Sequence, residues 1–169
     1  MRKNLKYISY LARHKWFVLV AGLKLHVPLW LIVIHDLSKL LPSEWKAYLH
    51  HFYDLPCTDP KCQPDRACAR CARRNADWMI AWRLHKCRNR HHWEFWLNPA
   101  TGAPFLMPEK YVREMVADWA ATGRTLSGRW EFTEWWATNK HKIVLDQYVR
   151  KQVEGLVEEL AAKVQGPIR

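Results

Sequence analysis

His35 and Asp36 stand together at the end of an apolar run that begins at Leu29. On the last turn of a helix, adjacent side chains project about 100° apart, so this imidazole and carboxylate can meet on one metal ion just beyond the helix. The alternative is an ordinary helix end, with an aspartate beside a histidine that makes only hydrogen bonds. Other histidines and acids in the chain decide between the two interpretations.

Polar residues with ligand chemistry also lie on faces that are otherwise apolar. His14 falls on the apolar face of a helix predicted over residues 2–24. Asp118 falls on the apolar face of a helix predicted to begin near Glu109, and Glu114 is a second inward candidate one turn earlier. A buried carboxylate must be paired, hydrogen-bonded or bound to metal, because burying it bare is costly. These inward residues favour metal binding at the His-Asp pair.

The densest chemical cluster in the sequence follows a helix predicted to begin near Asn75. Its members are His85, Arg88, Arg90, His91 and His92. An unbroken helix would place His85 and His92 about 10 Å apart, too far to share one ion, whereas a break near Asn89 would remove that limit. The histidines are therefore candidate ligands and the arginines candidate anion-binding groups. The alternative is a wet, basic helix end.

Four of the five cysteines form a C-x4-C-x5-C-x2-C pattern in a segment with prolines and no apolar periodicity. They are Cys57, Cys62, Cys68 and Cys71. Thiolates on short loops can close a tetrahedral zinc site that orders a segment too small to have its own core. We therefore predict a zinc-binding insertion over residues 55–74, against the alternative of a flexible loop of thiols. Cys87 is expected to be an ordinary helical cysteine, and His50 and His51 are weak ligand candidates.

Length and charge bound the domain organisation and the partners. A chain of 169 residues suits a single domain with a small appendage. Its formal charge of +11 would attract phosphate-bearing partners, whether a small molecule such as a nucleotide, a nucleic acid or an anionic membrane surface, and charge alone does not choose among them. Lys24, His26 and Pro28 interrupt the N-terminal apolar stretch, so we do not expect membrane insertion. A cytoplasmic protein follows, in which clustered cysteines favour metal over disulfides.

Helical periodicity accounts for most of the chain. Helices are predicted over residues 2–24, 29–34, 44–53, from about 75 onward, 109–122 and 144–164. The helix over 29–34 is expected to be buried on most sides, Ser43 is expected to cap the next helix, and Thr122-Gly123 is expected to close the fifth. We find no strand alternation, repeat or glycine-rich phosphate loop. The predicted fold class is all-α.

The order His14, His35-Asp36 and Asp118 resembles that of the HD-domain superfamily of metal-dependent phosphohydrolases. The stretch His35-Asp36-Leu37-Ser38-Lys39 looks like the HD-x-x-K variant of its motif. The chain also looks like an uncharacterised family of phage and bacterial proteins with the motifs HDLSK, N-x-HHW-x-x-W and EM-x-x-DW. The resemblance implies an HD-domain-like helical bundle that binds one or two divalent metals, among Mn, Mg, Fe, Co, Ni and Zn.

The resemblance also implies roles for individual residues. The primary metal ligands would be His14, His35, Asp36 and Asp118, with His85 and His91 or His92 for a second metal. The phosphate-binding residues would be Lys39, Arg88 and Arg90, and the catalytic ones Asp36, Lys39 and Arg88. The chain departs from the superfamily pattern in its cysteine-rich insertion, and in having no glutamate three residues after the aspartate, an acid that nucleotidase members often use.

Three functions of different classes are consistent with these features. The first is a phosphohydrolase acting on a nucleotide or related phosphoester, favoured by the ligand order and the positive charge. The second is an oxygenase on the same scaffold, because some superfamily relatives with six such ligands hold two irons. The third is a nucleic-acid-binding protein with structural metals, favoured by the basic cysteine segment and the 11 tryptophans.

Overall fold

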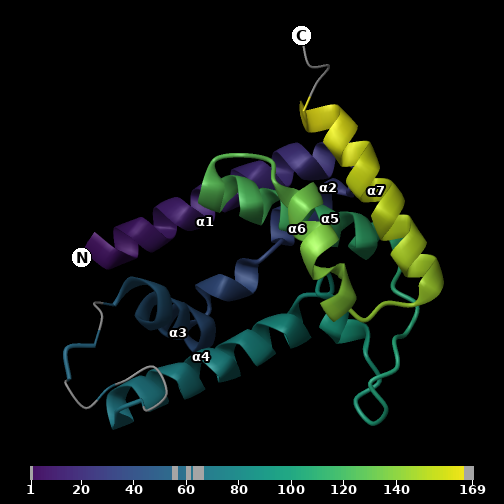
Figure 1. Cartoon of the computed structure of the whole chain (residues 1–169). Helices are drawn as coiled ribbons and strands as arrows, with labels where there is room; N and C mark the ends of the chain where they lie inside the picture. The colour runs from purple at the N-terminus through teal and green to yellow at the C-terminus, as the bar shows by residue number, and fades with distance from the viewer. Residues whose placement is uncertain (1, 55–56, 60–61, 63–66, 166–169) are drawn as a thin grey trace. The chain divides into compact units, whose positions relative to one another are not determined.

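The computed structural model describes residues 2–54, 57–59, 62 and 67–165, and within these ranges it is helical and contains no strand. The α-helices are α1 (Arg2–Lys24), α2 (Leu29–Ile34), α3 (Pro42–Tyr53), α4 (Ala69–Arg88), α5 (Glu109–Ser127), α6 (Phe132–Asn139) and α7 (Gln147–Gln165) (Figure 1). Short 3-10 helices are η1 (Leu37–Leu40), η2 (Trp93–Trp96) and η3 (Lys140–Lys142). The predicted all-α fold class is confirmed. None of the described helices has the length and apolarity needed to cross a bilayer.

The chain divides into two compact units, which we describe separately. Unit 1 holds the residues up to Ser9 together with Asp36–Arg88, and unit 2 holds Tyr10–His35 together with the residues from Asn89 onward. Helix α1 contributes residues to both units, and one unit boundary falls between His35 and Asp36. The predicted His-Asp pair is therefore shared between the units.

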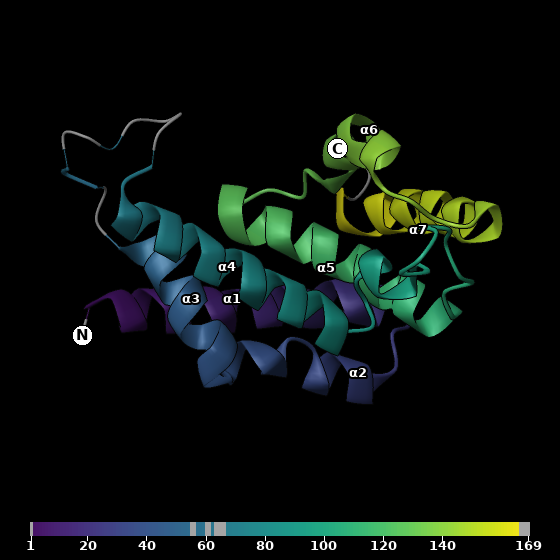
Figure 2. The same cartoon turned by 90° about the horizontal axis from the view of Figure 1, so that it is seen from below.

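Unit 1 is built on α3 and α4, which lie side by side (Figures 1 and 2). Aromatic rings fill the space between them: the Tyr48 ring meets the Trp78 ring edge-on, with centroids 4.7 Å apart. Along α4, Trp78, Trp82 and His85 follow at helical spacing, and the Trp82 and His85 rings stack at 5.6 Å. His85 therefore lies on the buried side of α4, and its exposed fraction is 0%.

Unit 2 is organised around α5, whose apolar face packs against α7 and α6. Small residues at Ala117, Ala120 and Ala121 are fully buried, so they allow neighbouring helices to approach α5 closely. The core includes Val112, Met115, Val116, Val149, Val153 and Leu160. Since the core fixes the rotation of α5, it also fixes the direction of the polar side chains on that helix.

Several predictions about the burial and the limits of the helices are wrong, each for a local reason. α2 buries only Leu31 and Ile32 and exposes its other residues, because a helix of six residues presents only one face to the core. α3 begins at Pro42 after Leu41, not after a Ser43 cap, because proline suits the first helical position. α4 begins at Ala69, inside the predicted insertion and well before Asn75.

The C-terminal end of α5 also differs from the prediction. Gly123 lies inside the helix, and the helix ends instead at Gly128, which has a φ of 78°. The N–H of Gly128 donates to the carbonyl oxygen of Arg124 at 3.1 Å. A residue in this left-handed conformation closes a helix, and glycine adopts it without the steric cost that a Cβ brings.

We predict opposite effects for alanine at these two glycines. Gly128→Ala should destabilise the chain by about 1 kcal/mol, because a Cβ is strained at positive φ. Gly123→Ala should stabilise it by about 0.5–1 kcal/mol, because alanine is the better helix former and no atom lies within 4 Å of the added Cβ. Urea unfolding of both variants measures the two changes. Equal effects of the two substitutions would contradict the observed helix end.

Candidate metal centre

Two buried carboxylates on α5 form the base of the candidate centre in unit 2. Glu114 and Asp118 are four residues apart, so they stand on one face of the helix, one turn from each other. Their exposed fractions are 3% and 9%. The sequence analysis identified both as inward-facing, and the structure confirms it. Carboxylates this deep require partners, and histidines provide them.

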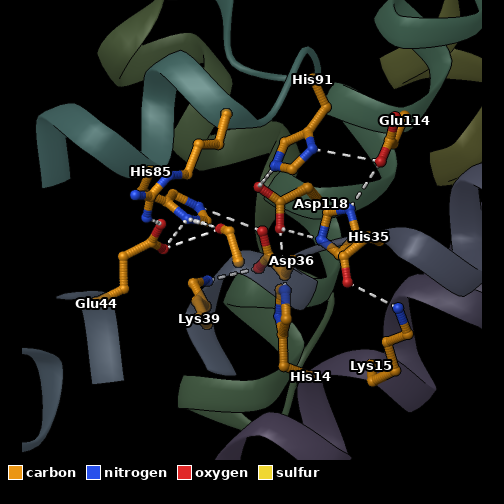
Figure 3. Close-up of polar contacts among 12 residues, drawn as sticks. His14, Lys15, His35, Asp36, Lys39, Glu44, His85, His91, Glu114 and Asp118 are labelled. Carbon is orange, nitrogen blue, oxygen red and sulfur yellow. Dashed lines mark hydrogen bonds and ion pairs between the residues drawn. The ribbon is translucent and has the colours of Figure 1, made fainter. Parts of the chain in front are cut away.

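His35 and His91 each bridge the two carboxylates (Figure 3). The Nδ1 of His35 lies 2.9 Å from Glu114 Oε1, and its Nε2 lies 3.4 Å from Asp118 Oδ1. His91 repeats this arrangement, with Nδ1 3.3 Å from Glu114 Oε1 and Nε2 4.0 Å from Asp118 Oδ2. The two rings lie beside each other with centroids 4.3 Å apart. One turn of α5 is therefore spanned twice by imidazole.

His14 completes the cluster from α1. Its Nε2 lies 3.1 Å from Asp118 Oδ1, the same oxygen that faces His35. His14 is buried, as its place on the apolar face of the first helix predicted, and its ring is parallel to that of Tyr10. Three Nε2 atoms from three separate segments thus surround one carboxylate. His14, His35 and Asp118, three of the four residues of the predicted primary metal site, thus lie together within unit 2, and metal binding by them stays a prediction.

The histidines hold both carboxylates in the charged form. Burial by itself would raise the pKa of Asp118, but hydrogen bonds and charge from His14 and His35 outweigh it and hold the pKa well below its usual value. Burial likewise opposes ionisation of Glu114, yet contacts with His35 and His91 lower its pKa. Because Glu114 faces Nδ1 of both rings, Nε2 is the nitrogen left to bind a metal.

The backbone around His35 explains its position. α2 ends at Ile34, and His35 is the C-cap residue with φ −48° and ψ 125°. The Nζ of Lys15 donates to the carbonyl oxygens of Val33 and His35 at 2.8 and 2.7 Å, which satisfies groups that the helix end leaves without intrahelical partners. The prediction that the His-Asp pair lies on the last turn of a buried helix is wrong. His35 reaches the cluster because the helix stops before it.

The donor set of unit 2 fits a divalent transition metal. Imidazole and carboxylate are the ligands that Zn, Fe, Mn, Co and Ni share. His14, His35 and Asp118 each offer one ligand atom to a group whose ligand atoms lie within 4.8 Å of one another. Glu114 suits the outer role, because a carboxylate on Nδ1 fixes the tautomer and ring orientation of a metal-bound histidine. The cluster therefore has ligands and an orienting carboxylate.

Unit 1 contains a second cluster in which a buried histidine lies between two carboxylates (Figure 3). Glu44 Oε2 lies 2.8 Å from His85 Nδ1, and the His85 Nε2 lies 3.2 Å from Asp36 Oδ1. Asp36 Oδ2 accepts a hydrogen bond from the Nζ of Lys39 at 2.5 Å. Here too one carboxylate holds Nδ1 of a buried histidine and an aspartate faces its Nε2. Asp36 and His85 are the predicted ligands of this unit.

Glu44 is a member of this cluster that the sequence placed only at the start of a predicted helix over residues 44–53. It is completely buried and accepts hydrogen bonds from Ser38 Oγ at 2.9 Å and from Arg88 Nη1 at 2.7 Å. Burial opposes its ionisation, but His85, Arg88 and Ser38 together lower its pKa. For His85, burial favours the neutral ring, whereas Asp36 and Glu44 outweigh it and raise its pKa. Glu44 lies four residues before Tyr48, so the two share one face of α3, and both are buried. This spacing is the sequence signal that could have predicted an inward position for Glu44.

Asp36 adopts a backbone conformation that is uncommon for a residue with a Cβ. Its φ is 59° and its ψ is 15°, in the left-handed region, and it precedes η1. Such positions cluster at functional sites, where the surrounding contacts over-determine them. Asp36 is fixed by His85 on one oxygen and Lys39 on the other. The HD-x-x-K spacing places the lysine one 3-10 turn after the aspartate.

The other predicted residues have identifiable positions. In unit 1, Nη1 of Arg88 is engaged by Glu44 and by Ser43 Oγ at 2.9 Å. In unit 2, Arg90 is exposed, with its guanidinium over the Phe95 ring and a 3.4 Å hydrogen bond to the Tyr111 hydroxyl. His92 is half-buried beside His91. Phosphate binding by these arginines and metal binding by His92 stay predictions.

The weak candidates on α3 have other contacts. His50 pairs with Asp54 at 2.9 Å, and the His51 ring stacks on Trp78. Neither residue is among the potential metal-binding groups found in the described part of the chain. The prediction that they are weak candidates is consistent with these contacts.

The four predicted cysteines cluster in unit 1, with their Sγ atoms within 4.8 Å of one another. Cys57 and Cys68 Sγ atoms are 3.6 Å apart, and the N–H of Cys68 donates to Cys62 Sγ at 3.4 Å. Cys71 lies on α4, so the last pair spans a helix start rather than a loop. Residues 55–56, 60–61 and 63–66 of the predicted insertion lie outside the described residues. A cluster consistent with structural zinc is present.

The thiols share charge in a way that suits metal binding. The backbone N–H of Cys71, with further help from the neighbouring thiols, lowers the pKa of Cys68 to about 7. Hydrogen bonds with the other three thiols raise the pKa of Cys71 to about 12, because a second thiolate beside the first is unfavourable. A zinc ion would replace the thiol protons and remove this repulsion.

Comparison with known families places the chain in one of them. Residues 3–163 match the model of DUF5662, which is described as a family of unknown function. The chain belongs to the DUF5662 family. Neither the curated proteins nor the solved structures gave a match to it. Function in this DUF5662 chain must therefore be argued from the residues of its clusters.

We predict that the unit 2 cluster binds Mn²⁺ and depends on both carboxylates. In the DUF5662 chain stripped of metal, Asp118→Asn should abolish Mn²⁺ binding, because it removes the carboxylate at the centre of the ring. Glu114→Gln should weaken binding about 10- to 100-fold, the usual cost of losing an outer partner. Titration calorimetry measures both. Glu158→Gln, an exposed change on α7, is the control, and Mn²⁺ affinity unchanged in Asp118→Asn would refute the site.

We predict that zinc content follows the cysteine cluster. Cys62→Ser and Cys71→Ser should each lower the zinc content of the purified DUF5662 chain by one equivalent, because a closed tetrahedral site needs four thiolates. Elemental analysis by mass spectrometry measures the loss. Cys87→Ser, an exposed cysteine outside the cluster, should leave zinc unchanged. Equal zinc in all the variants would show that the cluster is not a metal site.

Proposed function

We propose that this chain is a metal-dependent phosphohydrolase of the HD-domain type that acts on a nucleotide or related phosphoester. The observation that carries the proposal is the ring of His14, His35 and His91 Nε2 atoms around Asp118. The order of these ligands along the chain supports the same superfamily. The formal charge of +11 supports a substrate that carries phosphate.

The residues of unit 2 would prepare the site before substrate arrives. Glu114 sets the tautomer of His35 and His91, and burial holds both rings against rotation. Asp118 stays charged, so it contributes a negative ligand at neutral pH. A divalent ion held there would supply Lewis acidity, lowering the pKa of a bound water toward 7 and offsetting charge on the phosphate. The residues of the chain would fix the orientation of the histidine rings and keep the proton of each ring on Nδ1, which leaves Nε2 for the metal.

The residues of unit 1 supply further groups of the same chemistry. Asp36 and His85 are a nitrogen and oxygen donor pair oriented by Glu44, as the ligands of unit 2 are oriented by Glu114. Lys39 donates to Asp36 and has three N–H donors, so it can also donate to a phosphate oxygen. We further propose that the phosphate group of the substrate is bound by Lys39, Arg88 and Arg90. Cytoplasmic location is part of the same proposal.

An oxygenase is the second candidate, and one observation favours it. His14, His35 and Asp118 provide two histidines and one carboxylate, the set that non-haem iron oxygenases use. Metal content separates the two functions. Stoichiometric iron with visible absorbance in the purified chain would favour the oxygenase, whereas phosphate release with a redox-inactive ion such as Mg²⁺ or Zn²⁺ would favour the hydrolase.

We predict metal-dependent release of phosphate from nucleotides. The full chain, loaded with Mn²⁺, Co²⁺ or Ni²⁺, is assayed with nucleoside mono-, di- and triphosphates, with p-nitrophenyl phosphate and with bis-p-nitrophenyl phosphate. Asp118→Asn should lower kcat at least about a hundredfold, more than the loss of an outer partner costs. Glu114→Gln should lower activity at limiting metal and recover at excess metal, because its effect acts through affinity.

The matched control is Glu158→Gln, which removes the same charge from an exposed site and should keep full activity. Circular dichroism confirms that each variant folds. Absence of turnover with every substrate and metal, or turnover that Asp118→Asn leaves intact, would overturn the proposal. Diester-only turnover would restrict the substrate class to phosphodiesters.

A further inference from the structure

A cleft of about 740 Å³ lies in unit 1, and its lining residues do not include Asp36, Lys39, Glu44 or His85 of the carboxylate cluster of that unit. Its walls come from α3, around Lys46 and His50, and from the first three turns of α4. The α4 side includes Arg70, Arg73 and Arg74. These arginines lie three and four residues apart, so they share one side of the helix. The cleft is therefore lined by a row of cations.

The charges in the cleft do not cancel. Lys46 and the three arginines face two carboxylates, Asp54 and Asp77. Asp54 already has partners in unit 1, because Lys3 Nζ donates to it at 2.7 Å and His50 Nδ1 lies 2.9 Å away. The same contacts, led by Lys3, lower its pKa. Asp77 is the carboxylate that stands on the arginine helix itself.

The arginines occupy an electrostatically unfavourable position in the helix. α4 begins at Ala69 and has no acidic residue in its first turn, so Arg70, Arg73 and Arg74 crowd its N-terminal end. The helix dipole places positive partial charge there, and cations at that end cost stability while anions gain it. A bound polyanion would offset both the dipole and the arginines. Interaction with the helix dipole therefore does not account for three arginines at this end.

The cysteine cluster would fix this arginine row in place. Cys71 lies between Arg70 and Arg73, and Arg74 Nη2 lies 3.9 Å from Cys71 Sγ. Cys68 and Cys71 flank the start of α4, so a metal on the four thiolates would anchor the turn that carries the arginines. Such a metal would hold these arginines at the wall of the cleft.

We propose that this cleft binds the phosphate backbone of a nucleic acid without recognising base sequence. Arg70, Arg73 and Arg74 span about 6 Å of the helix axis at 1.5 Å per residue, which corresponds to about two phosphate steps of 3.4 Å along one strand. Guanidinium groups spread along a helix suit successive phosphates, which they bind in a fork-like geometry. A single small phosphate would need donors that converge on one point. The proposal is independent of the proposed hydrolase function.

The test is fluorescence anisotropy with the full, zinc-loaded chain and labelled oligonucleotides of single-stranded DNA, duplex DNA and RNA, over a range of salt. Wild type should bind with an affinity that falls as salt rises. Arg70→Gln and Arg73→Gln should each weaken binding and reduce the slope of log K against log salt by about 0.7 to 0.9, the value for one phosphate contact. Asp77→Asn should strengthen binding, because it removes the carboxylate from the arginine row.

Arg83→Gln is the matched control, because it removes the same charge from an exposed site on α4 outside the cleft. It should leave the salt slope unchanged. Equal effects of Arg73→Gln and Arg83→Gln would overturn the proposal, as would Asp77→Asn binding no more tightly than wild type. Binding of ATP or inorganic phosphate without binding of any oligonucleotide would also overturn it. Thermal unfolding of each variant confirms that the comparison is between folded chains.

Discussion

The structure of unit 2 depends on how two carboxylates are buried one turn apart on α5. Charged Glu114 and Asp118 would be too costly to leave bare inside a core. Contacts with three histidines from three segments offset that cost. The core around Val112, Val116 and Ala120 sets the rotation of α5, so packing decides where the carboxylates point and the carboxylates decide where the histidines must lie.

The same arrangement appears in both units with different residues. Glu114 in unit 2 and Glu44 in unit 1 each hold the Nδ1 of a buried histidine, while Asp118 and Asp36 face Nε2. A buried histidine needs one hydrogen-bond partner on each ring nitrogen, and neutral groups can fill both places. Carboxylates on both nitrogens are therefore more than hydrogen bonding of a buried ring requires. Orientation of ring and tautomer is what the outer carboxylate adds, and metal ligands are the residues that need it.

The sequence predicted more of the site than of the helix ends. Helical periodicity placed His14, Glu114 and Asp118 inward because tertiary packing follows apolar faces. It misplaced the end of α5, because a glycine inside a helix and one that closes it look alike until φ is known. It missed the role of Glu44, since a glutamate in a first helical turn is adequately explained by the helix dipole.

The break after α2 shows why local patterns could not supply the geometry at His35 and Asp36. A continuous helix would have pointed the two side chains about 100° apart from one rigid element. Instead the helix stops at Ile34, Lys15 caps its carbonyls, and Asp36 takes a left-handed backbone held by His85 and Lys39. His85, the more distant of these two partners of Asp36, is 49 residues away from it in sequence. Adjacent residues can therefore turn to different partners, since His35 contacts Glu114 and Asp118 in unit 2 whereas Asp36 contacts His85 and Lys39 in unit 1. The contacts with His85 and Lys39 hold the left-handed backbone of Asp36.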